Sequence, residues 1–193
     1  VVHAAAWTDV DGCELDKDRA YKINTAGTKN VALACKKEDA ALIYISTDFV
    51  FDGRKKSPYK ETDKTGPLSI YGGSKLKGEK AVANVLKKYF ILRTSWLYGA
   101  HGKNFVDKII AKAKTEKILK VVDDQVGSPT YTKDLAKAVH ALIKKISNLV
   151  RSVRLTTRPN LVRIFHVSNS GSVSWYGYAK EILKLTGSET KVM

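Results

Sequence analysis

The sequence predicts an α/β protein with a doubly wound parallel sheet and helices on both faces of that sheet. Two observations support this prediction. Short apolar runs alternate with longer stretches of helical periodicity along the 193 residues, and this alternation is typical of βαβ units. Polar residues directly follow two of the apolar runs, at 47–48 and 94–96. Because ligands bind at the carboxyl ends of the strands in such sheets, we expect these residues to line one functional edge.

Apolar periodicity and capping residues predict the individual elements. Ala20, Ile23 and Val31 recur at helical spacing and indicate a first helix. Asn104, Thr132 and Ser174 are expected to cap later helices, because their side chains accept hydrogen bonds from free backbone N–H groups. The strands are expected over 1–4, 41–46, 90–93, 118–122 and 164–167, and the helices over 16–38, 70–88, 105–113, 132–145 and 174–185.

The composition excludes several classes of protein. No apolar run is long enough to span a membrane, so no membrane partner is expected. Cys13 and Cys35 have no His or Cys neighbour at metal-ligand spacing, so we predict neither a metal site nor a disulfide. Free thiols suit a reducing compartment, and the expected localisation is cytoplasmic.

The chain has a net charge of +15, from 34 basic and 19 acidic residues. Most of the positive charge is lysine spread over the expected helices, which is typical of a solvated surface, so nucleic acid is not the expected partner. Four of the seven arginines fall within 146–163, a segment without acidic residues. We predict an atypical basic loop there, with a sequence error or a contact to a polyanion as alternatives.

A tyrosine and a lysine, Tyr71 and Lys75, stand four residues apart at the start of the helix expected over 70–88. They share one face of that helix, and Thr47 ends the strand that precedes them. A nearby ammonium lowers the pKa of a phenol. Tyr71 is therefore expected to act as a general acid in reduction or a general base in oxidation, with Thr47 bonded to the same substrate oxygen. No side chain can carry a hydride, so a nicotinamide coenzyme is implied.

The same spacing occurs a second time, in Tyr176 and Lys180. That pair lies in an aromatic stretch with Trp175 and Tyr178, inside the last expected helix. We therefore expect it to serve aromatic packing rather than catalysis.

A series of short motifs follows in order along the chain, at 4–6, 23–28, 46–53, 58–59, 71–75, 78–79, 93–96, 104–105 and 124–130. This series resembles the dTDP-4-dehydrorhamnose reductase family of extended short-chain dehydrogenase/reductases, from about residue 1 to 145 and again from 164. The resemblance implies a Rossmann-like fold. It also implies NAD(P)H-dependent reduction of the C4 ketone of dTDP-4-dehydro-L-rhamnose to dTDP-L-rhamnose, a precursor of cell-surface polysaccharide.

The resemblance further implies roles for individual residues. Tyr71 would give the proton, Lys75 would tune Tyr71 and hold the nicotinamide ribose of NADPH or NADH, and Thr47 would assist. The remaining implied contacts are Ala4, Ala5, Ala6 and Ile45 for the cofactor, Thr47, Asp48 and Trp96 for the nucleotide-sugar, and Asn24 as support for Lys75. A core aromatic is the alternative role for Trp96.

The chain also departs from the family pattern. Its 13 glycines form no Gly-rich phosphate loop, so we expect that loop and the first strands to lie upstream. We likewise expect the substrate-side region to continue past Met193. The expected domains are the C-terminal part of the cofactor-binding domain over 1–145, the basic loop over 146–163 and the start of the substrate-side region over 164–193. The strand at 1–4 then becomes an apolar edge of the sheet.

Other functions remain open from the sequence. A reductase or epimerase for another nucleotide-sugar would need the same residues, and a non-catalytic relative could regulate a partner subunit. A homodimer is compatible with either. The choice between NADH and NADPH also stays open, because the discriminating residue follows the second strand of such folds.

Overall fold

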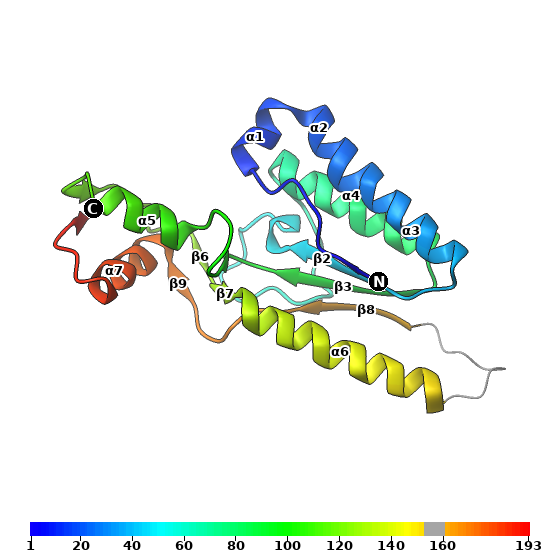
Figure 1. Ribbon diagram of the computed structural model, residues 1–193. Coiled ribbons are helices and arrows are strands. Elements are labelled where there is room, and N and C mark those ends of the chain that lie inside the picture. Colours follow the sequence, from blue (N-terminus) through cyan, green and yellow to red (C-terminus); the bar gives the residue numbers. More distant parts are fainter. Residues whose placement is uncertain (153–160) are drawn as a thin grey trace. The chain divides into compact units, whose positions relative to one another are not determined.

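A parallel β-sheet forms the centre of the first of two units into which the chain divides (Figure 1). The computed structural model describes residues 1–152 and 161–193. The first unit comprises 1–94 with the described residues of 152–166, and the second comprises 95–151 and 167–193. Each unit is described by itself below.

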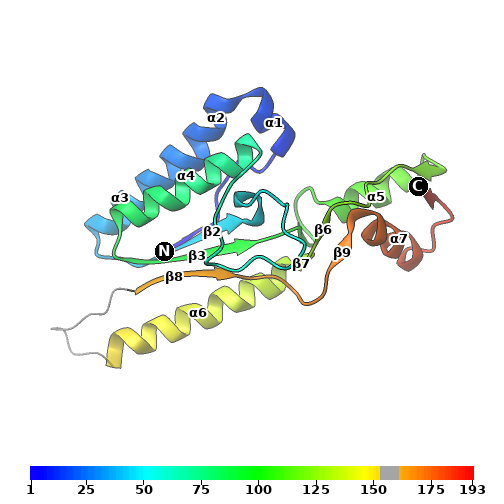
Figure 2. The ribbon, with the colours of Figure 1, turned by 180° about the vertical axis from the view of Figure 1, so that it is seen from behind.

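The sheet of the first unit has the strand order β1-β2-β3-β8, and all its strand pairs are parallel. Figure 2 shows it from the side opposite to Figure 1. The parallel sheet predicted from the alternating pattern is thus confirmed, and β1 lies at one end of its strand order. The strands are β1 (Val2–His3), β2 (Leu42–Thr47), β3 (Lys88–Thr94) and β8 (Leu161–His166).

Helices pack on one face of this sheet (Figure 1). They are α1 (Val10–Leu15), α2 (Lys17–Tyr21), α3 (Thr28–Lys37) and α4 (Ile70–Val85), with a π-helical turn η1 (Lys22–Gly27) between α2 and α3. The helix predicted over 16–38 therefore exists, with a local widening in its middle. The sequence analysis missed α1, a short helix that begins where Asp9 accepts a hydrogen bond from Gly12 N.

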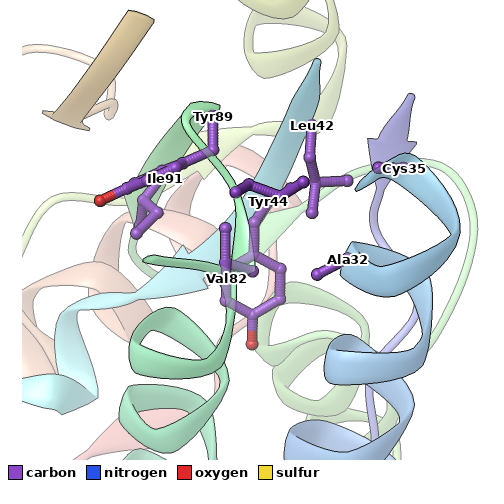
Figure 3. Close-up of a cluster of buried hydrophobic side chains, with 8 residues drawn as sticks. Ala32, Cys35, Leu42, Tyr44, Val82, Tyr89 and Ile91 are labelled. Atoms are coloured by element: carbon purple, nitrogen blue, oxygen red, sulfur yellow. The ribbon is translucent and has the colours of Figure 1, made fainter. Parts of the chain in front are cut away.

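The core of the first unit lies between the sheet and the helices α3 and α4 (Figure 3). Leu42 and Tyr44 from β2 and Ile91 from β3 contact Ala32 of α3 and Val82 of α4. Alternate residues of β2 point to this face, as the pleat of a strand requires. The remaining buried members of the cluster are Cys35, Leu86 and Tyr89.

Gly78 lets α4 pack closely against the sheet. A Cβ atom at this position would lie 2.6 Å from Tyr44 Oη and 2.8 Å from the backbone oxygen of Asn24. Alanine normally stabilises a helix by about 1 kcal/mol relative to glycine, but here the overpacking dominates. We expect Gly78→Ala to reduce the free energy of unfolding by about 1–2 kcal/mol, measured by urea denaturation.

Gly73→Ala provides the matched control for that experiment. Its Cβ would meet only the side-chain hydroxyl of Tyr21, at 3.0 Å. That side chain can move, so the loss should be smaller than for Gly78→Ala. Equal losses at both positions would contradict the close packing of α4 on Tyr44.

In the part of the chain that the structure describes, the second unit contains three helices and three two-stranded ladders. In its core, Ile109 of α5 contacts Ile182 and Leu183 of α7. Asn104 and Ser174 cap α5 and α7 as predicted, and the bounds of α5 match the prediction. The helices are α5 (Phe105–Ala113), α6 (Thr132–Ser152) and α7 (Trp175–Leu185), and the strands are β4 (Leu97–Tyr98), β5 (Ile118–Leu119), β6 (Val126–Gly127), β7 (Thr130–Tyr131), β9 (Val173–Ser174) and β10 (Lys191–Val192).

The loop predicted over 146–163 is wrong at both of its ends. Helix α6 continues to Ser152, and β8 already begins at Leu161. Apolar residues at Ile146, Leu149 and Val150 extend the helical spacing, and this signal outweighs the change in charge. The middle of the predicted loop, 153–160, lies outside the described residues. Among the helices described, none is long and apolar enough to cross a membrane.

Candidate active site

Thr47 and Asp48 lie at the carboxyl end of β2, where the strand turns into a short 3-10 helix (Asp48–Val50). The hydroxyl of Thr47 accepts a hydrogen bond from Phe49 N at 3.2 Å and donates one to Asp48 Oδ1 at 3.0 Å. Burial raises the pKa of Asp48 to about 6, against hydrogen bonds that lower it. A carboxylate and a hydroxyl are therefore fixed together at the predicted edge of the sheet.

Tyr71 projects from the first turn of α4 toward this strand end. Ser69 caps the helix, because its side chain accepts a hydrogen bond from Gly72 N at 3.0 Å. A glycine is required at position 72, since a Cβ atom there would collide with the backbone of Phe49. The ring of Tyr71 is buried against Cys13 and Ala20. Thr47 lies close enough to the phenol to lower the pKa of Tyr71, so the structure brings the predicted acid and its predicted helper together.

The protonation of Tyr71 differs from the prediction. Burial raises the pKa of Tyr71 to about 12, the hydrogen bond with Thr47 lowers it, and the carboxylate of Asp48 raises it. The predicted lowering of this pKa by Lys75 is therefore wrong for the structure. The result keeps the proton on the phenol at neutral pH, which suits a group that donates a proton.

Lys75 lies one turn further along α4 and is 3% exposed. Its Nζ donates a hydrogen bond to the carbonyl oxygen of Ile45 at 2.7 Å and lies 4.2 Å from the centroid of the Tyr44 ring. Burial lowers the pKa of Lys75 to about 8, and the charge of Glu79 opposes that change. The amine is thus fixed at the carboxyl half of β2.

The lowered pKa of Lys75 predicts a dependence of stability on pH. Between the folded pKa of about 8 and the ordinary value of 10.5, the unfolded chain binds more protons than the folded chain. The contribution of Lys75 to stability should therefore rise with pH over this window. We expect the unfolding free energy of the wild type, measured relative to that of Lys75→Met, to increase by about 2 kcal/mol from pH 8 to pH 10. A difference that stays flat in urea titrations across this window would contradict the burial of a charged amine.

Asn24 connects the segment after β1 to helix α4. It lies in the π-helical turn η1, is 1% exposed, accepts a hydrogen bond from Trp7 N at 2.8 Å and donates one to Trp7 O at 3.0 Å. Its Nδ2 also donates to Ser74 Oγ at 3.0 Å. The hydrogen bonds of Asn24 thus reach the residue next to Lys75, and direct support of Lys75 itself stays a prediction. Single π-turns inside helices are frequent at functional sites.

Trp96 belongs to the second unit and has an unusual backbone there. Its φ is +48°, a left-handed value that is rare for a residue with a bulky side chain. The Trp96 ring stacks on the Trp175 ring with the centroids 3.4 Å apart. A Cβ atom at Gly127 would lie 2.5 Å from the Trp96 ring. Such strain occurs where surrounding contacts fix a side chain. The stack supports the aromatic packing role, and the contact with a nucleotide-sugar stays a prediction.

The comparison with known proteins decides the family. The family model described as RmlD substrate binding domain matches residues 1–193. The chain belongs to this family. It is 44% identical over 193 residues to the spore coat polysaccharide biosynthesis protein SpsK of Bacillus subtilis, covering 100% of this chain and 63% of the relative.

Solved structures of the same family agree with the fold. A dTDP-4-dehydrorhamnose reductase from Clostridium acetobutylicum is 45% identical, with a TM-score of 0.89, over 100% of this chain and 64% of that chain. A dTDP-4-dehydrorhamnose reductase from Bacillus anthracis, solved in complex with NADP, is 42% identical, with a TM-score of 0.88, over 100% of this chain and 63% of that chain. The predicted Rossmann-like class is confirmed. The chain spans less than two thirds of the length of these relatives.

The NADP complex of the Bacillus anthracis reductase prompts a test of fit for the residues present here. Ala4, Ala5 and Ala6 follow β1, and the first two are exposed. Small exposed side chains after a strand leave room for an extended ligand, and Lys75 Nζ supplies a donor at the same sheet edge, beside Ile45. These residues fit a nicotinamide coenzyme. Among the residues described, no group of three His, Cys, Asp or Glu side chains could hold a metal ion.

Sequence reasoning missed the residues that hold this part of the RmlD fold together. Glu79 accepts hydrogen bonds from Ser46 Oγ at 2.6 Å and from Arg93 Nε and Nη2 at 3.0 and 2.7 Å, and all three residues are buried. Glu79 stands four residues after Lys75 on α4 and could have been found from that spacing. Tyr44 could have been found from its alternation with Ser46 on β2.

Proposed function

We propose that this protein reduces the C4 ketone of dTDP-4-dehydro-L-rhamnose to dTDP-L-rhamnose, with NADPH or NADH as the hydride donor. The observation that carries the proposal is the meeting of the buried, protonated phenol of Tyr71 with Thr47 at the end of β2, where Thr47 lowers and burial raises the pKa of Tyr71. It occurs in a chain more than 40% identical to proteins named dTDP-4-dehydrorhamnose reductase. Identity of this degree supports a shared reaction class.

The residues of this chain would divide the work as follows. A nicotinamide coenzyme supplies a hydride when bound. Tyr71 gives its phenolic proton to the C4 oxygen as that oxygen gains charge, and Thr47 holds the same oxygen by a second hydrogen bond. The amine of Lys75 binds ribose hydroxyls, and Ala4, Ala5 and Ala6 leave space beside them. Because the pKa of Tyr71 is raised to about 12, the phenol stays protonated until the substrate oxygen needs the proton.

The remaining assignments concern the substrate and the cell. Asp48 and Trp96 would contact the nucleotide-sugar, as the resemblance to the reductase family implies. Two free, buried cysteines, Cys13 and Cys35, are compatible with a reducing cytoplasm. A homodimer is part of the proposal, and sedimentation equilibrium of the full-length protein would test it.

A substrate panel tests the proposed reaction. The full-length protein is mixed with NADPH or NADH and with dTDP-4-dehydrorhamnose or other 4-keto nucleotide-sugars, and the loss of nicotinamide absorbance is followed. We expect the highest kcat/KM with the dTDP-linked 4-keto sugar. Faster turnover of a differently linked sugar would assign the site to another nucleotide-sugar. No turnover by a folded protein, with capture of a partner subunit, would favour the non-catalytic relative.

A further inference from the structure

The ring of Tyr44 has two basic side chains, His3 and Lys75, as close neighbours in the first unit. Tyr44 is completely buried. The imidazole of His3 stacks on it with the centroids 5.6 Å apart and the planes inclined by 24°. The Nζ atom of Lys75 lies 4.2 Å from the ring centroid. The aromatic face is therefore a close neighbour of the buried amine.

The surrounding elements fix this ring in place. Figure 3 shows it reaching from β2 between Val82 of α4 and Ala32 of α3. Gly78 leaves space for the hydroxyl, which a Cβ there would approach to 2.6 Å. His3 Nε2 in turn contacts Thr28 Oγ1 at 3.1 Å. Buried among these neighbours, the ring of Tyr44 is held beside Lys75.

We propose that Tyr44 is a positioning residue for Lys75: the face of its ring holds the ammonium against the carbonyl oxygen of Ile45. The inference rests on the proposed function, in which Lys75 binds the coenzyme ribose. An aromatic face attracts a cation through its quadrupole, and the attraction is strongest where water is excluded. Tyr44 thus keeps a buried amine charged and directed toward the carboxyl edge of the sheet.

The charges around Lys75 show why such support is needed. Burial lowers the pKa of Lys75, and Glu79 on the same helix is the anion that opposes this. The nearby His3 on β1 has its own pKa lowered by burial and by Lys75. The carbonyl of Ile45 and the ring of Tyr44, both on β2, supply the remaining favourable contacts.

Two substitutions separate the contribution of the ring face from that of the hydroxyl. Tyr44→Phe keeps the aromatic face, whereas Tyr44→Leu removes it. The readout is the pKa of Lys75 in the full-length protein, followed by NMR of labelled lysine side chains and assigned with Lys75→Met. We expect Tyr44→Leu to lower this pKa by about one and Tyr44→Phe to leave it within about 0.3 of wild type. Tyr89→Leu is the matched control, since it removes another tyrosine of the same core cluster.

The outcomes distinguish this inference from the proposed reaction. A Lys75 pKa that is unchanged in folded Tyr44→Leu, or lowered equally by Tyr89→Leu, overturns it whatever the substrate. If Tyr44→Leu does not fold, singly, doubly and triply fluorinated phenylalanine at position 44 weaken the ring quadrupole at nearly constant size. The pKa should then fall stepwise with fluorination, and a constant value overturns the inference. With coenzyme, Tyr44→Leu should raise KM for the nicotinamide by about tenfold with a smaller change in kcat.

Discussion

Tyr71→Phe is expected to reduce turnover of the 4-keto nucleotide-sugar about 10³-fold and to leave the fold intact. The substitution removes one oxygen, and general acid catalysis by a positioned side chain contributes about 10²–10⁴-fold. The ring that packs on Cys13 and Ala20 is retained. Thr47 keeps its contacts with Asp48 and Phe49 N. The measurement is kcat/KM of the full-length protein, with circular dichroism and the melting temperature as tests of the fold.

The chain offers a matched control for this experiment in its second tyrosine–lysine pair. In α7, Lys180 Nζ lies 5.4 Å from the ring centroid of Tyr176. Tyr176 stands four residues before its lysine, as Tyr71 does, and Tyr176→Phe also removes one hydroxyl. This variant should change kcat/KM by less than about twofold. Comparable losses in the two variants, or activity in Tyr71→Phe above about a tenth of wild type, would sink the assignment of Tyr71 as the acid.

Glu79→Gln is expected to destabilise the fold more than Gly78→Ala does. Glu79 and Arg93 form an ion pair at 2.7 Å in which both side chains are 5% exposed. Removing one partner leaves the guanidinium buried without its counter-charge, which costs about 3–5 kcal/mol. Urea denaturation and the melting temperature measure the loss. The pKa of Lys75 should also fall, because the charge of Glu79 raises it.

Glu116→Gln is the control for a pair of the same chemistry at the surface. Lys112 and Glu116 lie 3.9 Å apart on and beside α5, with side chains 61% and 46% exposed. Exposed pairs of this kind contribute about 0.3–0.5 kcal/mol. If Glu79→Gln reduces the unfolding free energy no more than Glu116→Gln does, the buried Glu79–Arg93 pair does not stabilise the fold as expected.

Much of the fold could be predicted because its signals are local. The bounds of α5 follow from the cap at Asn104, and the parallel sheet follows from alternating patterns. The meeting of Thr47 with Tyr71 follows because the helix after a strand begins on the side of the sheet where that strand ends. The raised pKa of Tyr71 could not be predicted in the same way. Spacing along a helix shows which side chains are neighbours, but burial is set by distant segments such as the one that carries Cys13.

The extension of α6 shows a second limit of prediction from sequence. A sudden change in charge suggests the end of an element, yet the apolar spacing continues through it and the helix runs to Ser152. Short ladders such as β5 with β10 were also missed or misjudged in length. Their strands are too short to carry a periodic signal of their own.

The side chain of Asn24 joins the segment after β1 to helix α4 by hydrogen bonds. Its carboxamide accepts a hydrogen bond from Trp7 N and donates one to Trp7 O, as the backbone of a neighbouring strand would do. Trp7 directly follows Ala4, Ala5 and Ala6. The third bond of Asn24 fixes the same amide to Ser74, between Tyr71 and Lys75. A ligand that shifted the alanine segment would therefore act through Asn24 on α4, the helix that bears Tyr71. Under the proposed function, the buried carboxamide of Asn24 would therefore couple coenzyme binding beside the alanines to the position of Tyr71 on α4.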